Sequence, residues 1–282
     1  MTQETHTLEL LTPCFCAGAD PAKAEIRAPS IRGQLRWWFR VLGGSHQEEA
    51  EVFGSVAGEH GRASAVCIRV EGISKPAFWN PPQLNPNSNL GYLLYFASKS
   101  SEGKRWENGG ALAPGHQFKI HIHCRKKLAA NLDEKLALAW SAFLAFGTIG
   151  YRATRGLGAF HNLNSQPRID ESFEKIRSLG FLGGFSNWSG AKEDVLPALG
   201  AQLRGLRQGF SATRPGPLGG ANPRQASAVR MRPIRESNGN FRILVFEAPK
   251  EKILGAPSKS RAPRLNESIP DLMNPPAKKT WK

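Results

Sequence analysis

The residues best suited to chemistry in this sequence are three arginines spaced four residues apart, Arg32, Arg36 and Arg40. They lie in the stretch PSIRGQLRWWFRVLGG, between Pro29 and Gly44. In a helix this spacing places the guanidinium groups in one cationic row, which can bind an anion such as a nucleic-acid backbone. The alternative is an amphipathic core helix whose arginines are merely solvated. On this pattern alone the alternative is slightly favoured.

The same stretch carries the signals of one short helix. Ser30 is predicted as its N-cap, and Gly43 with Gly44 as its end, so we expect a helix over residues 30–42. Trp37 points away from most of the apolar arc, where an indole can add to anion or base binding. The apolar arc that this helix would bury consists of Ile31, Leu35, Trp38, Phe39 and Leu42.

A second candidate site is the glycine-rich segment GTIGYRATRGLGAF, which begins at Gly147. Glycine lets backbone N–H groups approach phosphates closely, and the interleaved arginines can pair with them. The alternative is a structural bend after a helix. The residues that we expect to contact the ligand in this segment are Gly150, Arg152, Arg155, Gly156 and Gly158. Lys23 and Arg27 extend the cationic character ahead of the first helix.

The charge of the whole chain favours the anion-binding interpretation at both sites. The 282 residues include 38 Lys and Arg against 23 Asp and Glu, a formal net charge of +15. Such an excess favours RNA, DNA or an acidic membrane surface. The sequence has no apolar run long enough to span a bilayer and no secretory signal, so we expect a cytoplasmic protein without a membrane partner. The four cysteines lack zinc-site spacing, and we expect no metal or cofactor.

The first half of the chain alternates between strand and helix patterns in an informative order. Strands are predicted over 5–11, 63–73, 118–124 and 160–163, and helices over 30–42 and 131–146. This is the βαββαβ order of the ferredoxin-like fold, an α+β class shared by RNA-recognition modules. An irregular insertion over 75–115 is expected to bind or dock on something, with GYLLYFAS as an edge strand.

The second half is less regular. Helices are predicted over 170–179 and 191–208, and a hairpin over 229–234 and 241–247, joined through SNGN. From residue 249 the chain is basic, proline-rich and poor in large apolar residues, which predicts a tail ordered only by a partner.

Two motifs together resemble a known family. The run TPCFCAGADPAKAEIRAPSIRGQLRWWFRVLGG, followed by EAEVFGS, resembles the first RAMP-superfamily subunit of the type III-B CRISPR Cmr effector complex, the Cmr1 type. GTIGYRATRGLGAF resembles the glycine-rich loop of the RAMP superfamily. The resemblance implies two ferredoxin-like RAMP domains, at 1–165 with the insertion 75–115 and, reduced or irregular, at 166–248. The basic tail then covers 249–282.

The resemblance also implies a function. It implies a non-catalytic subunit in antiviral defence that contacts the 3′ region of crRNA, captured target RNA or both, beside other Cmr subunits. The residues expected to contact RNA are Lys23, Arg27, Arg32, Arg36, Trp37, Arg40, Gly150, Arg152, Arg155, Gly156 and Gly158. One alternative is a metal-independent RAMP endoribonuclease that processes precursor crRNA through His46, or secondarily His60. Another is a protein–protein scaffold whose basic surface meets acidic neighbours.

Overall fold

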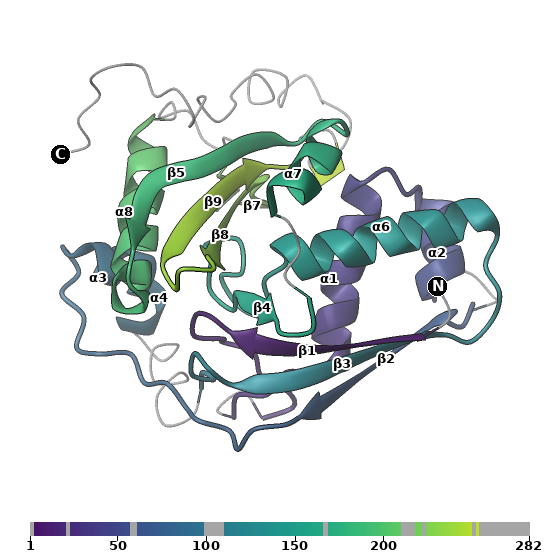
Figure 1. The fold of residues 1–282 in the computed structure, drawn as a ribbon, viewed down its shortest axis with the longest axis horizontal. Helices are drawn as coiled ribbons and strands as arrows, with labels where there is room; N and C mark the ends of the chain where they lie inside the picture. Colours follow the sequence, from purple (N-terminus) through teal and green to yellow (C-terminus); the bar gives the residue numbers. More distant parts are fainter. Residues whose placement is uncertain are drawn as a thin grey trace.

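A computed structural model describes residues 3–20, 23–56, 61–98, 110–165, 169–209, 218–221, 224–249 and 252–253. Its first half contains a four-stranded antiparallel sheet in the order β2-β3-β1-β4 (Figure 1). The strands are β1 (Gln3–Leu10), β2 (Val66–Gly72), β3 (Gln117–Cys124) and β4 (Phe160–Asn162). With the helices α1 (Ala28–Val41) and α6 (Ala130–Phe146), the elements follow the predicted strand–helix–strand–strand–helix–strand order.

The two helices lie on the same face of this sheet because alternate strand residues are apolar. Leu8, Phe118, Ile120 and Ile122 are fully or almost fully buried beneath α1 and α6. The opposite face is polar: Thr5 pairs across the strands with His121, whose ring lies 3.0 Å from the Thr5 hydroxyl. The strand pattern therefore sets which face of the sheet receives the helices.

The insertion after β2 is helical where an edge strand was expected. Its apolar centre forms α3 (Asn89–Leu93) and α4 (Tyr95–Ser98), so the prediction for GYLLYFAS is wrong. The physical reason is a local cap: the Ser88 hydroxyl accepts a hydrogen bond from the Gly91 N–H at 2.9 Å. The apolar side of α3 then packs on a helix of the second half, α8 (Val195–Gly209).

The contact between α3 and α8 attaches the described part of the insertion to the second half of the chain. A Cβ atom added at Gly200 would lie 1.9 Å from the Asn89 carbonyl oxygen, so only glycine permits this approach. The Arg204 guanidinium donates to the carbonyl oxygens of Asn87 and Ser88 and lies over the Tyr92 ring. The described part of the insertion thus docks on the rest of the chain (Figure 1).

The second half forms a three-stranded antiparallel sheet in the order β5-β9-β8. The predicted hairpin is confirmed as β8 (Val229–Arg235) and β9 (Phe241–Glu247), and the two predicted helices as α7 (Ile169–Arg177) and α8. The strand β5 (Leu182–Gly190) escaped prediction because GGFSNWSG is rich in turn-forming residues. The remaining elements are α2 (His46–Phe53), the 3-10 turn η1 (Lys192–Asp194), β6 (Gly220–Ala221) and β7 (Arg224–Gln225).

The two sheets share their cores through β9. Phe246 on one face of β9 packs with Trp38 and Phe181, whereas Val245 on the other face belongs to a cluster with Leu199. Residues on both sides of the predicted domain limit at 165 therefore contribute to one core cluster, and the predicted tail lies almost wholly outside the described residues. Among the described helices, none is both long and apolar enough to cross a bilayer.

Candidate nucleic-acid interface

Helix α1 presents the predicted arginines, but it begins earlier than expected. It starts at Ala28 with Arg27 as N-cap and Pro29 in its first turn, where the fixed φ of proline suits a helix start. Ser30 is therefore not the N-cap, and its hydroxyl instead lies 3.3 Å from the Cys16 thiol. The helix ends as predicted, with Gly43 at φ +107°. The predicted apolar arc is confirmed as buried.

Two of the three arginines in the row share one carboxylate. Glu49 of α2 is buried and accepts hydrogen bonds from Arg36 Nε at 2.5 Å and Arg40 Nη1 at 2.6 Å. Burial alone would raise the pKa of Glu49, but the bonds from Arg40 and Arg36 outweigh it and lower that pKa. The row is therefore partly neutralised at its C-terminal end and held rigidly against α2.

Arg32, at the other end of the row, lines a surface hollow instead. This hollow of about 510 Å³ is also lined by Arg36, Ser55, Arg62 and Ser64. The Nε atom of Arg32 is buried and has no hydrogen-bond partner among the described residues. A donor held in this way beside two further guanidinium groups suits an anionic ligand.

A second hollow of about 640 Å³ adjoins the first and shares Arg62 and Ser64 with it. It adds Arg125 and Lys126, both exposed, from the turn after β3. Arg125 is held in place by donating to the Ser64 carbonyl oxygen at 2.7 Å. None of the described residues lining the two hollows is acidic. We call Arg32, Arg36, Arg62, Arg125 and Lys126 the basic track.

Three members of the basic track were not among the predicted site residues. Arg125 and Lys126 belong to the run CRKK, a cluster of like charges that could have marked the site from sequence. Arg62 is isolated in the sequence, and only the fold brings it beside Arg32. The predicted Lys23 and Arg27 are both exposed, and Arg27 lies 3.4 Å from the carboxylate of Glu25.

Trp37 does not lie on an open surface as its predicted role requires. The guanidinium carbon of Arg230, a buried residue of β8, lies 3.6 Å from the centre of the Trp37 ring. Arg230 also donates to Gln34 at 3.3 Å. This face of the indole is therefore covered by the protein, and Trp37 serves the packing of α1 on β8.

The first half of the glycine loop (residues 147–158) is exposed at Tyr151 and Arg152, and Arg152 bears a cation. Arg152 has φ +57°, and it is the one non-glycine residue with positive φ among those described. Its guanidinium lies 5.5 Å from the ring centres of both Phe96 and Tyr151, and Tyr151 is 44% exposed. A strained, exposed arginine beside an exposed aromatic ring is typical of a functional surface.

The other end of the glycine loop is buried against the second half. Arg155 is 5% exposed, and its Nη2 donates to the Leu218 carbonyl oxygen at 2.9 Å. Burial, with the charges of Arg207 and Arg152, lowers the pKa of Arg155 to about 9. A Cβ atom at Gly156 would lie 2.7 Å from Leu199, so this glycine serves packing against α8. The burial of Arg155 and Gly156 contradicts their predicted exposure to RNA.

Gly150 and Gly158 also serve protein packing. A Cβ atom at Gly158 would lie 1.8 Å from the Ile149 carbonyl oxygen, and one at Gly150 would lie 2.6 Å from the Phe15 carbonyl oxygen. Both have positive φ, which explains the choice of glycine without a phosphate. Gly158 is buried and its N–H donates to the Pro13 carbonyl oxygen, whereas a phosphate contact by the partly exposed Gly150 stays a prediction.

The exposed end of the glycine loop lies next to the segment that leads into α1. Tyr151 N–H donates to the Phe15 carbonyl oxygen at 2.7 Å. The next residue, Cys16, contacts Ser30 in the first turn of α1. The glycine loop and the first turn of α1 are thus connected through Phe15 and Cys16, whereas no residue of the loop is among the described residues that line the hollow beside Arg32.

The RAMP superfamily model matches residues 7–161, a span that includes β1, α1, the insertion and the glycine loop. The chain belongs to the RAMP superfamily. Within that superfamily it is of the Cmr1 type, because it is 34% identical over 183 residues to Cmr subunit Cmr1-2 of Pyrococcus furiosus, covering 56% of this chain and 94% of that relative.

Two further comparisons show how similar this RAMP chain is to other Cmr1 proteins. It is 29% identical over 196 residues to Cmr subunit Cmr1-1 of Pyrococcus furiosus, which covers 68% of this chain and 52% of that relative. The chain thus spans about half the length of Cmr1-1. The crystal structure of Cmr1 from Pyrococcus furiosus in its apo form shares the fold, with a TM-score of 0.54 at 20% identity over 88% of each chain.

His46, the first histidine candidate for catalysis in this RAMP chain, has no developed acid–base pair in the described residues. The His46 side chain is 95% exposed, and its Nδ1 lies 3.8 Å from the Glu49 carboxylate that already binds two arginines. His60, the second candidate, lies outside the described residues. The His46 ring therefore faces solvent, and the nearby Glu49 carboxylate is already bonded to Arg36 and Arg40.

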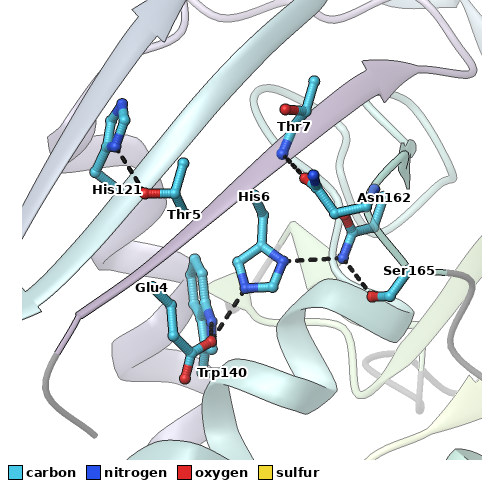
Figure 2. A network of polar contacts seen from close by, with 9 residues as sticks. Glu4, Thr5, His6, Thr7, His121, Trp140, Asn162 and Ser165 are labelled. Atoms are coloured by element: carbon cyan, nitrogen blue, oxygen red, sulfur yellow. Dashed lines mark hydrogen bonds and ion pairs between the residues drawn. The ribbon is translucent and has the colours of Figure 1, made fainter.

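The most elaborate histidine contacts are structural. Figure 2 shows His6 between Glu4 and Asn162, with the Glu4 carboxylate also reaching Trp140. His6 Nε2 donates to Glu4 Oε2 at 3.0 Å, and His6 Nδ1 accepts from the Asn162 amide at 3.1 Å. Trp140 Nε1 donates to the same Glu4 oxygen at 2.8 Å. With both ring nitrogens engaged, His6 ties β1 to α6 and β4.

Proposed function

We propose that this chain is a non-catalytic RNA-binding subunit of a type III-B CRISPR Cmr effector complex. It contacts the 3′ region of crRNA, captured target RNA or both, and it assembles with other Cmr subunits. The names of its Cmr1 relatives support the membership of that complex. Each of its two sheets belongs to a ferredoxin-like unit, and the second unit is reduced to three main strands.

The basic track is the single observation that carries RNA binding. Its five cations line two adjoining hollows whose described lining residues include no acidic side chain, and Arg36 is also bonded to the buried Glu49 carboxylate behind them. A groove lined by positive charges binds along the phosphate backbone of an RNA strand, and this binding releases counterions from the RNA. The exposed pair Tyr151 and Arg152 adds a ring on which an unpaired base can stack.

The sheet arrangement supports the ferredoxin-like proposal for both halves. In the first half, the order β2-β3-β1-β4 with α1 and α6 on one face is that expected of a βαββαβ unit. In the second half, β5, α8, β8 and β9 follow in the order strand–helix–strand–strand. Their sheet order β5-β9-β8 matches the β1-β3-β2 part of the first sheet.

The test is fluorescence anisotropy with a labelled single-stranded RNA, comparing the wild type with the double variant Arg32→Ala, Arg62→Ala. We expect the double variant to bind roughly 10-fold more weakly or worse. We also expect the slope of log K against log salt to fall by about 1.4, because each phosphate contact on a single strand contributes about 0.7.

The matched control is Arg69→Ala, Lys192→Ala, which removes the same charge from exposed positions outside the basic track. Equal weakening by both double variants would mean that net charge, not the basic track, determines binding. Normal RNA binding by the Arg32, Arg62 variant would overturn the proposed surface and favour the scaffold alternative.

A separate RNA cleavage assay tests the proposal that the chain is non-catalytic. The purified wild type is incubated with a labelled repeat-containing RNA, without metal, and the products are separated on a denaturing gel. We expect intact RNA, because His46 has no reserved proton acceptor among the described residues. Cleavage that His46→Ala abolishes would establish the endoribonuclease alternative instead.

A further inference from the structure

The region where the two sheets pack against each other, here called the seam, contains a buried arginine. This arginine has no carboxylate partner among the described residues. Arg232 of β8 is 2% exposed. Its Nη2 donates to the Phe160 carbonyl oxygen and its Nε to the Ala145 carbonyl oxygen at 3.4 Å, while the guanidinium lies over the Phe160 ring. Nη1 is buried and has no hydrogen-bond partner among the described residues. Burying such a charge without compensation is costly.

Arg232 lines a cavity of about 50 Å³ between the two sheets. His161, Asn162 and Arg235 supply its other polar walls, and residues such as Leu11 and Ile169 its apolar walls. One water needs about 10–15 Å³ of such space, so the cavity has room for a small ion or a few waters. Because His161, Ile169 and Arg235 are half-buried, the cavity can be reached from solvent.

The neighbouring groups leave one positive charge unbalanced in this cavity. Arg235 is paired with Glu9, their atoms 3.0 Å apart. Asn162 commits its amide to His6 and Ser165. Burial, together with the charges of Arg235 and Arg232, lowers the pKa of His161, so its ring is neutral at pH 7. Arg232 keeps its charge there, although burial lowers its pKa to about 9.

We propose that this cavity binds a small monovalent inorganic anion of the chloride class, which balances the charge of the Arg232 guanidinium in its wall. The size of the cavity excludes nucleotides and bulky carboxylates. The partly apolar walls suit a weakly hydrated ion better than fluoride or sulfate, which lose more hydration energy on burial. Water alone in the cavity would not balance the charge of Arg232. The bound anion then contributes to holding β8 against α6 and β4.

The first experiment measures the melting temperature of the full chain in sodium chloride and in sodium gluconate at equal ionic strength. We expect chloride to raise the wild-type melting temperature by roughly 2–4 °C over gluconate, as a ligand specific to the folded state does. Arg232→Met should lose this difference. Arg230→Met is the matched control, because Arg230 is equally buried on the same strand but does not line the cavity.

Each outcome decides the proposal. A chloride effect that Arg232→Met retains places the ion elsewhere, and equal wild-type melting in both salts shows water only; either result overturns the proposal. If Arg232→Met does not fold, wild-type crystals soaked in bromide give the answer through anomalous scattering. A bromide peak beside Arg232 supports the site, and a map without one overturns it.

Discussion

Two sets of arginines in this protein carry the same charge but lie in opposite environments. The basic track lies on the surface of the first half, where Arg62 and Arg125 are exposed and Arg32 and Arg36 are half-buried. The seam arginines Arg155, Arg230 and Arg232 are each 5% exposed or less and donate to carbonyl or amide oxygens of the protein. Burial, not residue type, separates an arginine that a large ligand such as RNA can reach from one that is enclosed between the halves of the fold.

The glycine loop shows the same division within twelve residues. Its first end presents Arg152 over two aromatic rings, whereas its second end buries Arg155 beside Leu218. The Thr154 carbonyl oxygen accepts from Met231 N–H at 3.1 Å, so the loop is joined to β8 directly before Arg155. The loop therefore connects the proposed RNA surface to the seam.

Gly158→Ala should distort the glycine loop and have the largest effect on stability. An added Cβ would lie 1.8 Å from the Ile149 carbonyl oxygen at a φ of +65°, so the backbone must move. We expect the free energy of unfolding to fall by about 3–5 kcal/mol, measured by urea denaturation. The control is Gly43→Ala, which has φ +107° and open space, and should cost only about 1 kcal/mol. Equal costs would show that the close approach in the loop is unimportant.

Comparing Arg230→Ala with Arg32→Ala tests whether the seam arginines stabilise the fold while the basic-track arginines bind RNA. Arg230→Ala removes a buried side chain stacked on Trp37, and we expect a loss of about 2–4 kcal/mol in the free energy of unfolding. RNA affinity per folded molecule should stay within twofold of wild type. Arg32→Ala should do the reverse, with weaker RNA binding and a change in stability within about 1 kcal/mol. Loss of RNA binding in folded Arg230→Ala would contradict the division.

Glu49→Gln should affect stability less than Gly158→Ala or Arg230→Ala, and it tests the role of the basic track. The variant weakens the bonds to Arg36 and Arg40, both partly exposed, so we expect a loss of about 1–2 kcal/mol at pH 7. Because Arg36 and Arg40 would then be free to bind phosphate, we expect Glu49→Gln to strengthen RNA binding. Weaker RNA binding would mean that Glu49 holds Arg36 in its binding position.

The pH dependence of the same variant checks its cause. The pKa of Glu49 is lower in the folded than in the unfolded chain. Its contribution is therefore complete above the unfolded pKa and is lost as pH falls through the folded pKa. Denaturation from pH 7 down to acid should show the wild type losing its advantage over Glu49→Gln below the ordinary range for glutamate. A difference independent of pH would exclude this linkage.

Local patterns in the sequence predicted much of the first half. The alternation in FKIHIHC and the apolar arc of α1 depend on near neighbours, so the strand faces and the buried side of the helix followed from spacing. The same holds for the β8–β9 hairpin around Asn238–Gly239. The strand β5 could not be predicted because its glycine-rich sequence is held by pairing with β9.

By itself, the sequence determined the family, the charge and the row of arginines on α1, because these depend on composition and on residues within a few turns of one another. Only the tertiary structure decided which arginines are available. The Glu49 carboxylate reaches Arg36 and Arg40 through the packing of α2 on α1, and Arg230 covers Trp37 from a strand almost two hundred residues away. Desolvation depends on what packs against a residue, and that comes from distant parts of the chain.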